Sequence, residues 1–110
     1  GNWTSATVST EWSYLDWPVS SADLEKLRGV RFVFTSGSHA LEIDGVELLE
    51  NGKVIDRDRH AGLAGKPSRG NFYKLSLPKG IHANNGCSLR ARVRSVGGKS
   101  SNGKLELVKE

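Results

Sequence analysis

The chain has 110 residues, of which 25% are charged and 36% hydrophobic, and its formal net charge is +4. This length suits a single domain with a core of its own, and no apolar run approaches the roughly 20 residues of a membrane helix. A single cysteine, Cys87, excludes an internal disulfide and a cysteine-rich zinc site. Cys87 lies in an apolar alternation, which predicts a buried, inert thiol.

Residues 1–19 carry all the tryptophans of the chain, namely Trp3, Trp12 and Trp17. The segments around Val8 and over 12–19 have the composition of strands. Indole rings suit the apolar faces of pyranose rings, so this density is compatible with a sugar-stacking platform. The favoured alternative is that these aromatic side chains cover one end of a core.

The segment 20–29 is the one predicted helix. Ser20 or Ser21 can cap its first turn, and Gly29 can end it. Leu24 and Leu27 would share its buried face. Residues 30–35 then alternate in polarity, which predicts a half-buried strand.

The centre of the chain, 40–62, is predicted to be a hairpin around Asn51-Gly52, a dipeptide that favours a type I′ turn. Upstream, the apolar positions change parity at Asp44-Gly45, which indicates a β-bulge or a second tight turn. The turn predicts these opposing pairs: Glu50 with Lys53, Leu49 with Val54, Leu48 with Ile55, Glu47 with Asp56 and Val46 with Arg57.

The rest of the chain adds strands over 71–77, 87–96 and 104–108, with loops at 61–70, 78–86 and 97–103. The 87–96 strand alternates most regularly, with Cys87, Leu89, Ala91 and Val93 facing inward and Ser88, Arg90, Arg92 and Arg94 facing outward. About seven or eight short strands and one short helix predict an all-β fold. We expect an antiparallel β-sandwich, either jelly-roll or galactose-binding-like, or immunoglobulin-like.

A polar cluster follows the hairpin turn. Asp56, Asp58 and His60 occupy alternate positions, so they would project to one face, and the predicted register adds Glu47. Oxygen ligands grouped in this way suit Ca²⁺ or sugar hydroxyls, so Glu47, Asp56 and Asp58 are the candidate metal ligands. The favoured alternative is a solvated face neutralised by neighbouring arginines and lysines.

The outward-facing arginines of 87–96 suggest a nucleic-acid surface as an alternative function. The aromatic residues are not expected to interleave with this stripe, so a solvated face is favoured over phosphate binding. Catalysis is not expected either, because the chain has no GxSxG or HExxH motif and no histidine pair at ligand spacing.

Several segments carry a resemblance to a known family: ALEIDGVELLENGKVIDRDRHAGLAG at 40–65, NFYKLSLP at 71–78, LRARVRSVGG at 89–98 and SNGKLEL at 101–107. Within the first, Asp58, His60, Gly62 and Gly65 match a D-x-H-x-G-x-x-G pattern. The chain resembles the C-terminal β-sandwich module of secreted bacterial β-N-acetylhexosaminidases (chitobiase-like, glycoside hydrolase family 20) and of related polysaccharide-degrading enzymes.

The resemblance implies that residues 1–110 are a non-catalytic module of a larger exported glycosidase, located in the periplasm, at the cell surface or outside the cell. The absence of a leader at the first residues also favours a module cut from a longer chain. The implied partners are the catalytic domain of the same chain and a weakly bound glycan, without nucleic acid, a membrane span or a cofactor other than Ca²⁺. A structural spacer and a basic nucleic-acid-binding domain are the alternatives. The candidate glycan contacts are Trp12, Trp17, Asp58, His60 and Asn71.

Overall fold

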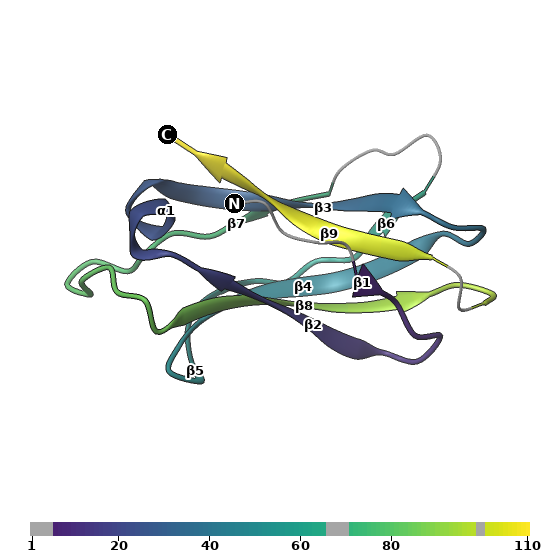
Figure 1. The fold of residues 1–110 in the computed structure, drawn as a ribbon, viewed down its shortest axis with the longest axis horizontal. Coiled ribbons are helices and arrows are strands. Elements are labelled where there is room, and N and C mark those ends of the chain that lie inside the picture. Colours follow the sequence, from purple (N-terminus) through teal and green to yellow (C-terminus); the bar gives the residue numbers. More distant parts are fainter. Residues whose placement is uncertain (1–5, 66–70, 99–100) are drawn as a thin grey trace.

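The computed structural model describes residues 6–65, 71–98 and 101–110 and confirms the all-β prediction. Two antiparallel sheets pack face to face, with β3 and β9 in one layer and β2, β8 and β4 in the other (Figure 1). The strand orders are β1-β9-β3-β7 and β2-β8-β4-β5, and β6 pairs with the start of β4. The described elements are β1 Ala6–Thr7, β2 Ser13–Val19, α1 Ser21–Lys26, β3 Leu27–Ser36, β4 Leu41–Glu50, β5 Lys53–Asp58, β6 Gly62–Ala64, β7 Asn71–Lys74, β8 Cys87–Ser95 and β9 Asn102–Lys109.

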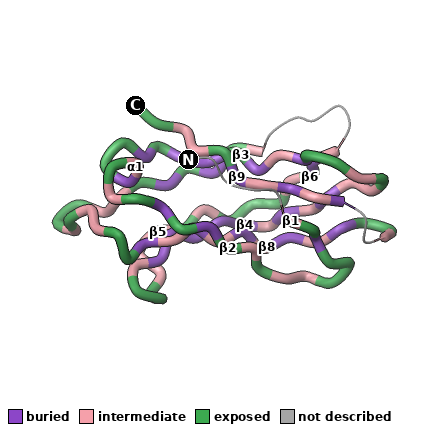
Figure 2. The backbone as a smooth tube through the Cα atoms, viewed as in Figure 1, coloured by how far each residue is buried: buried purple, intermediate pink, exposed green. Residues whose placement is uncertain are grey.

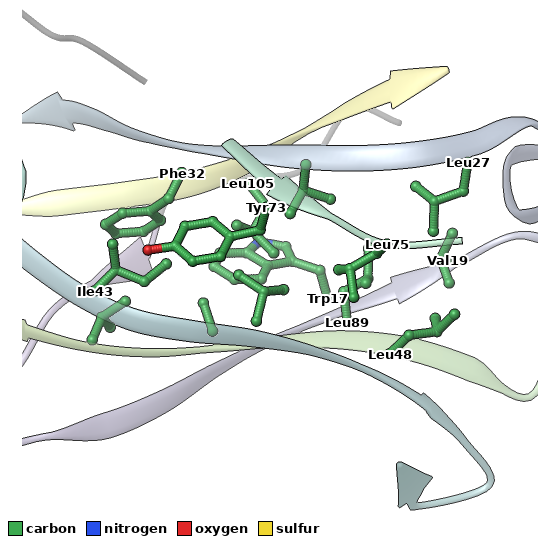
Figure 3. Close-up of a cluster of buried hydrophobic side chains, with 14 of the residues drawn as sticks. Trp17, Val19, Leu27, Phe32, Ile43, Leu48, Tyr73, Leu75, Leu89 and Leu105 are labelled. Carbon is green, nitrogen blue, oxygen red and sulfur yellow. The ribbon is translucent and has the colours of Figure 1, made fainter. Parts of the chain in front are cut away.

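The core lies between the two sheets, because each long strand buries one side of its alternation (Figure 2). Phe32 and Leu105 come from one sheet, and Ile43, Leu48 and Leu89 come from the other (Figure 3). Burying such a side chain stabilises the fold by about 1.5–3 kcal/mol. The predicted inward face of β8 and the buried thiol of Cys87 are both confirmed. No helix in the described ranges is long and apolar enough to cross a membrane.

The helix α1 is shorter than predicted. It begins as expected, because the Ser20 side chain accepts a hydrogen bond from the backbone N–H of Asp23 at 3.2 Å. It ends at Lys26, however, and Leu27 is the first residue of β3. The prediction that Gly29 ends the helix is therefore wrong. A Cβ on Gly29 would lie 2.5 Å from the carbonyl oxygen of Tyr73, so this glycine allows β7 to pack closely against β3.

The predicted hairpin turn is present, with Asn51 at φ 48° and Gly52 at φ 84°. The first two predicted pairs are confirmed, but a β-bulge at Ile55 then shifts the register by one residue. The other predicted pairs are therefore wrong, and the observed partners are Leu48 with Asp56, Glu47 with Arg57 and Val46 with Asp58. Because opposing residues share a face, the shift turns Asp56 and Asp58 to the inner side and leaves Glu47 opposite an arginine on the outer side.

The bulge predicted at Asp44-Gly45 is confirmed, since Ile43 pairs with Val93 while Gly45 pairs with Arg92. Asp44 is the extra residue. The bulge lets both halves of β4 bury their apolar side chains, because Ile43 and Val46 are buried although their spacing breaks strict alternation. It also presents Asp44 on the outer face.

Part of the predicted 61–70 loop is a strand, because β6 pairs with the start of β4 through Leu41 with Ala64 and Ile43 with Gly62. The rest of that prediction, 66–70, lies outside the described residues. The predicted 71–77 strand is shorter, since β7 covers only Asn71–Lys74. Its buried side is confirmed at Tyr73 and continues at Leu75.

Candidate functional site

The outer face of the β2-β8-β4-β5 sheet carries cross-strand ion pairs, and we call it the charged face. Arg90 Nε lies 2.7 Å from Glu47 Oε1, and Arg94 Nη2 lies 3.0 Å from Glu42 Oε2. Between them, Arg92 pairs with Asp44, the residue presented by the bulge. Every arginine of the predicted stripe is therefore paired with a carboxylate.

The pair of Glu47 and Arg90 is the most buried of these. Glu47 is 6% exposed, and Arg57 Nη2 also approaches its carboxylate at 3.9 Å. A carboxylate removed from water needs such partners, because an unpaired buried charge is strongly unfavourable. The hydrogen bond to Glu47 in turn raises the pKa of Arg90.

Two aromatic side chains lie against the arginines of the charged face. The guanidinium carbons of Arg92 and Arg94 lie 4.7 and 4.9 Å from the Trp12 ring centroid. The guanidinium carbon of Arg90 lies 4.4 Å from the Tyr14 ring centroid. These are cation–π distances. The expectation that aromatic residues do not interleave with the arginine stripe is therefore wrong.

Two hollows meet at the Asp44 bulge on this face. One, of about 180 Å³, has lining residues that are mostly polar: Tyr14, Asp44, Gly45, Glu47, Arg59 and Arg92. We call it the bulge pocket. The other is a more open hollow of about 420 Å³ lined by Trp12, Glu42, Ile43, Asp44, Ala61, Gly62 and Leu63. Together they combine aromatic rings with hydrogen-bonding groups of both charges, as sites for small polar ligands do.

The nominated aspartates do not line either hollow. Asp58 Oδ2 accepts a hydrogen bond from the backbone N–H of Lys74 at 2.8 Å, and Asp56 Oδ2 accepts one from the N–H of Ser76 at 3.0 Å. These bonds join β5, at the edge of one sheet, to the β7 edge of the other sheet. The N–H of Leu75 points the opposite way, to the carbonyl of Arg28. Asp56 and Asp58 occupy alternate positions, as do the two residues whose N–H groups they accept, so the spacing of the carboxylates matches that of the amides.

His60 and Asn71 complete the same edge. The imidazole of His60 stacks on the Tyr73 ring, with centroids 4.1 Å apart, and its Nδ1 lies 3.2 Å from Asp58 Oδ1. The Tyr73 hydroxyl donates to the His60 carbonyl at 2.7 Å. Burial, with a contribution from Asp58, raises the pKa of Tyr73 to about 12.

Asn71 Nδ2 donates to the Leu63 carbonyl at 3.0 Å, and its side chain lies over Gly62. A Cβ on Gly62 would stand 2.5 Å from Asn71 Oδ1, so any other residue at this position would displace the Asn71 side chain. Three residues of the D-x-H-x-G-x-x-G pattern thus belong to one structural unit, the edge latch, which we define as Asp56, Asp58, His60, Gly62, Asn71 and Tyr73.

The candidate metal set is not assembled. Glu47 is on the charged face with Arg90, while Asp56 and Asp58 face inward toward β7. In the parts of the chain that the structure describes, no three His, Cys, Asp or Glu side chains are placed to hold a metal ion. The prediction is wrong because the bulge at Ile55 moved the register by one residue.

Of the candidate glycan contacts, Trp12 is the one that lines either of the two hollows described above. Trp17 is 5% exposed and belongs to the buried hydrophobic cluster (Figure 3), so its ring faces are not available to a sugar. Asp58, His60 and Asn71 belong to the edge latch. Sequence reasoning missed Asp44 and Arg59 as site residues, although the change of parity at the bulge was a signal for Asp44.

The fold and the site together define an antiparallel β-sandwich with an aromatic-lined, charged outer face. No protein-family model matches the chain, and a search of curated proteins returned no match.

Proposed function

We propose that the chain is a non-catalytic module that binds carbohydrate weakly on the charged face. The observation that carries the proposal is the junction of the two hollows at Asp44, with Trp12 bordering one and Tyr14 bordering the other. A pyranose offers an apolar ring face to an aromatic side chain and a rim of hydroxyls to charged groups. The paired carboxylates and guanidiniums beside Asp44 can accept and donate hydrogen bonds to such hydroxyls.

The resemblance of residues 40–65 to chitobiase-like modules supports a more specific form of this proposal. In that form, the chain is an accessory domain of an exported bacterial glycosidase, and its partner is the catalytic domain of the same polypeptide. Weak binding suits such a role, because a tethered module raises the effective concentration of the catalytic domain near a polymeric substrate.

A structural spacer is the second candidate, and one observation favours it. Leu63 and Phe72 are 61% and 42% exposed, on the adjacent strands β6 and β7. Apolar side chains of this size on a surface are compatible with packing against a neighbouring domain. A nucleic-acid role has less support, because the arginine stripe of β8 (Arg90, Arg92 and Arg94) is engaged by carboxylates.

The test is a titration with oligosaccharides, followed by backbone amide chemical shifts. Oligomers of N-acetylglucosamine and, in separate titrations, oligosaccharides from plant and bacterial polysaccharides are added to the purified chain, with and without Ca²⁺. We expect saturable shifts at residues of β2, β4 and β8. Trp12→Ala should weaken binding about tenfold, which corresponds to about 1.4 kcal/mol.

The matched control is Phe72→Ala, which removes an exposed aromatic ring on the opposite sheet. It should leave glycan binding unchanged. Shifts that map to β3 and β7, or equal losses in both variants, would contradict the proposed site. No saturable shift with any glycan would overturn carbohydrate binding and favour the spacer.

A further inference from the structure

The bulge pocket contains a guanidinium, that of Arg59, to which the described residues supply no partner. Its two carboxylates are already engaged, Asp44 by Arg92 and Glu47 by Arg90. Arg59 lines the same pocket, yet it makes no ion pair or hydrogen bond with the described part of the chain. The lining carboxylates Asp44 and Glu47 are thus neutralised by Arg92 and by Arg90, which lies beside the pocket, so the positive charge of Arg59 is not balanced by either of them.

Arg59 is also held in position from both sides. Asp58, before it, is bonded to the backbone of Lys74, and His60, after it, is stacked on Tyr73. Its side-chain stem lies against the bulge, where a Cβ on Gly45 would stand 3.2 Å from Arg59 Cγ. The edge latch thus fixes the backbone on either side of Arg59, so binding a ligand here costs little backbone conformational entropy.

We propose that the bulge pocket selects an anionic sugar whose carboxylate or sulfate group binds the Arg59 guanidinium. This rests on the proposed carbohydrate binding and specifies its ligand class. A planar guanidinium offers paired N–H donors that match the oxygens of either anion. Tyr14, at the opposite rim, presents an aromatic ring to the sugar, and Asp44 can accept hydrogen bonds from its hydroxyls. A neutral sugar would form no charge-assisted hydrogen bond with Arg59.

The test compares three disaccharides that differ in charge: a neutral N-acetylglucosamine disaccharide, a glucuronate-containing disaccharide and a sulfated disaccharide. Binding to the folded chain is measured by amide shifts at low and high salt. We expect the favoured anionic sugar to bind about tenfold more tightly than the neutral one. Arg59→Gln should abolish this preference, and Arg59→Lys should retain part of it because the charge remains.

Arg31→Gln is the matched control, since Arg31 is an exposed arginine on β3 in the other sheet, 5.8 Å from the Phe72 ring. It removes the same charge without touching the pocket. Equal losses in Arg31→Gln and Arg59→Gln would mean general electrostatic attraction and would overturn the proposal. Preference for the glucuronate or for the sulfated sugar, lost only in Arg59→Gln, would support it and identify the anion.

The two levels of the proposal fail differently. Equal binding of neutral and anionic sugars, unchanged in Arg59→Gln, would overturn the anionic class and leave carbohydrate binding standing. Absence of binding by all three sugars and by the longer oligosaccharides would overturn both.

Discussion

Removing the carboxylate of Asp58 should loosen the seam between β5 and β7 without disturbing the rest of the core. In the native structure Asp58 accepts a backbone hydrogen bond from Lys74 at 2.8 Å and contacts His60 Nδ1. In Asp58→Ala the Lys74 N–H loses its acceptor, and the edge of β7 loses one of its two links to β5.

The size of the effect follows from the geometry. A hydrogen bond to a charged acceptor contributes about 1.5–3 kcal/mol, and the 29% exposure of the Asp58 side chain selects the lower end. An unfolding entropy of about 2.1 cal/mol/K per residue converts about 1.5 kcal/mol into a Tm decrease of about 6 °C for this chain. The Asp56→Ala/Asp58→Ala double variant should lose about twice as much.

Hydrogen exchange gives a local readout of the same bond. In Asp58→Ala the Lys74 amide should exchange faster, whereas the Leu75 amide, bonded to the Arg28 carbonyl, should keep its protection. Asp16→Ala, which removes an exposed aspartate from β2, is the control and should change stability by less than about 0.5 kcal/mol. The reasoning fails if Asp58→Ala and Asp16→Ala have the same Tm and the same Lys74 exchange rate.

Three further predictions concern ionisation and close packing. Because the pKa of Tyr73 is raised to about 12, the unfolded chain loses this proton first, and stability should fall between about pH 10 and pH 12, as urea unfolding can measure. The hydrogen bond from Lys109 lowers the pKa of Asp23 in the folded chain. The stabilisation from this ionised carboxylate is therefore present above about pH 4 and disappears as the pH falls through the pKa of the folded state. Thermal unfolding of Asp23→Asn should show a loss of stability at pH 7 only. Gly62→Ala should displace Asn71 and cost about 1 kcal/mol in urea.

Each has its own control. Tyr73→Phe should remove the alkaline loss and Tyr14→Phe should keep it, and the reverse result would contradict the assignment. An Asp23→Asn deficit that is the same at pH 2.5 and pH 7 would exclude the Lys109 contribution. Gly62→Ala should cost less in an Asn71→Ala background, because the clash and the hydrogen bond are then already gone; strictly additive losses would rule out the contact.

The features that were predicted correctly from the sequence are those that produce a local or periodic pattern of residues. The alternation from Cys87 to Ser95 predicts which side of β8 is buried, and Asn51-Gly52 predicts the turn because positive φ is required there. The bulge at Asp44 was detectable because it shifts the parity of apolar residues on either side. Each of these signals is carried by neighbouring residues of one strand or turn.

The features that could not be predicted from the sequence depend on contacts with residues distant in the chain. The bulge at Ile55 changes no apolar alternation, because charged residues follow it, so nothing in 53–58 distinguishes the two registers. Gly29 appeared to end a helix, since its real constraint, the Tyr73 carbonyl, is 44 positions away. The β6 strand contains only three residues, too few for a period to appear.

The aspartates of the edge latch show why a polar pattern alone does not identify a binding site. Alternate carboxylates on a strand suit a cation, a sugar or the free N–H groups of a neighbouring strand edge. Backbone N–H groups leave no signal in the sequence, because every non-proline residue supplies one. An exposed edge is also a hazard for aggregation, and inward-pointing charges are one way to protect it. Asp56 and Asp58 serve β7 in this manner. Because they are thereby occupied, the proposed ligand site is on the charged face, at Arg59, which lies between the latch residues Asp58 and His60 and makes no ion pair or hydrogen bond with the described residues.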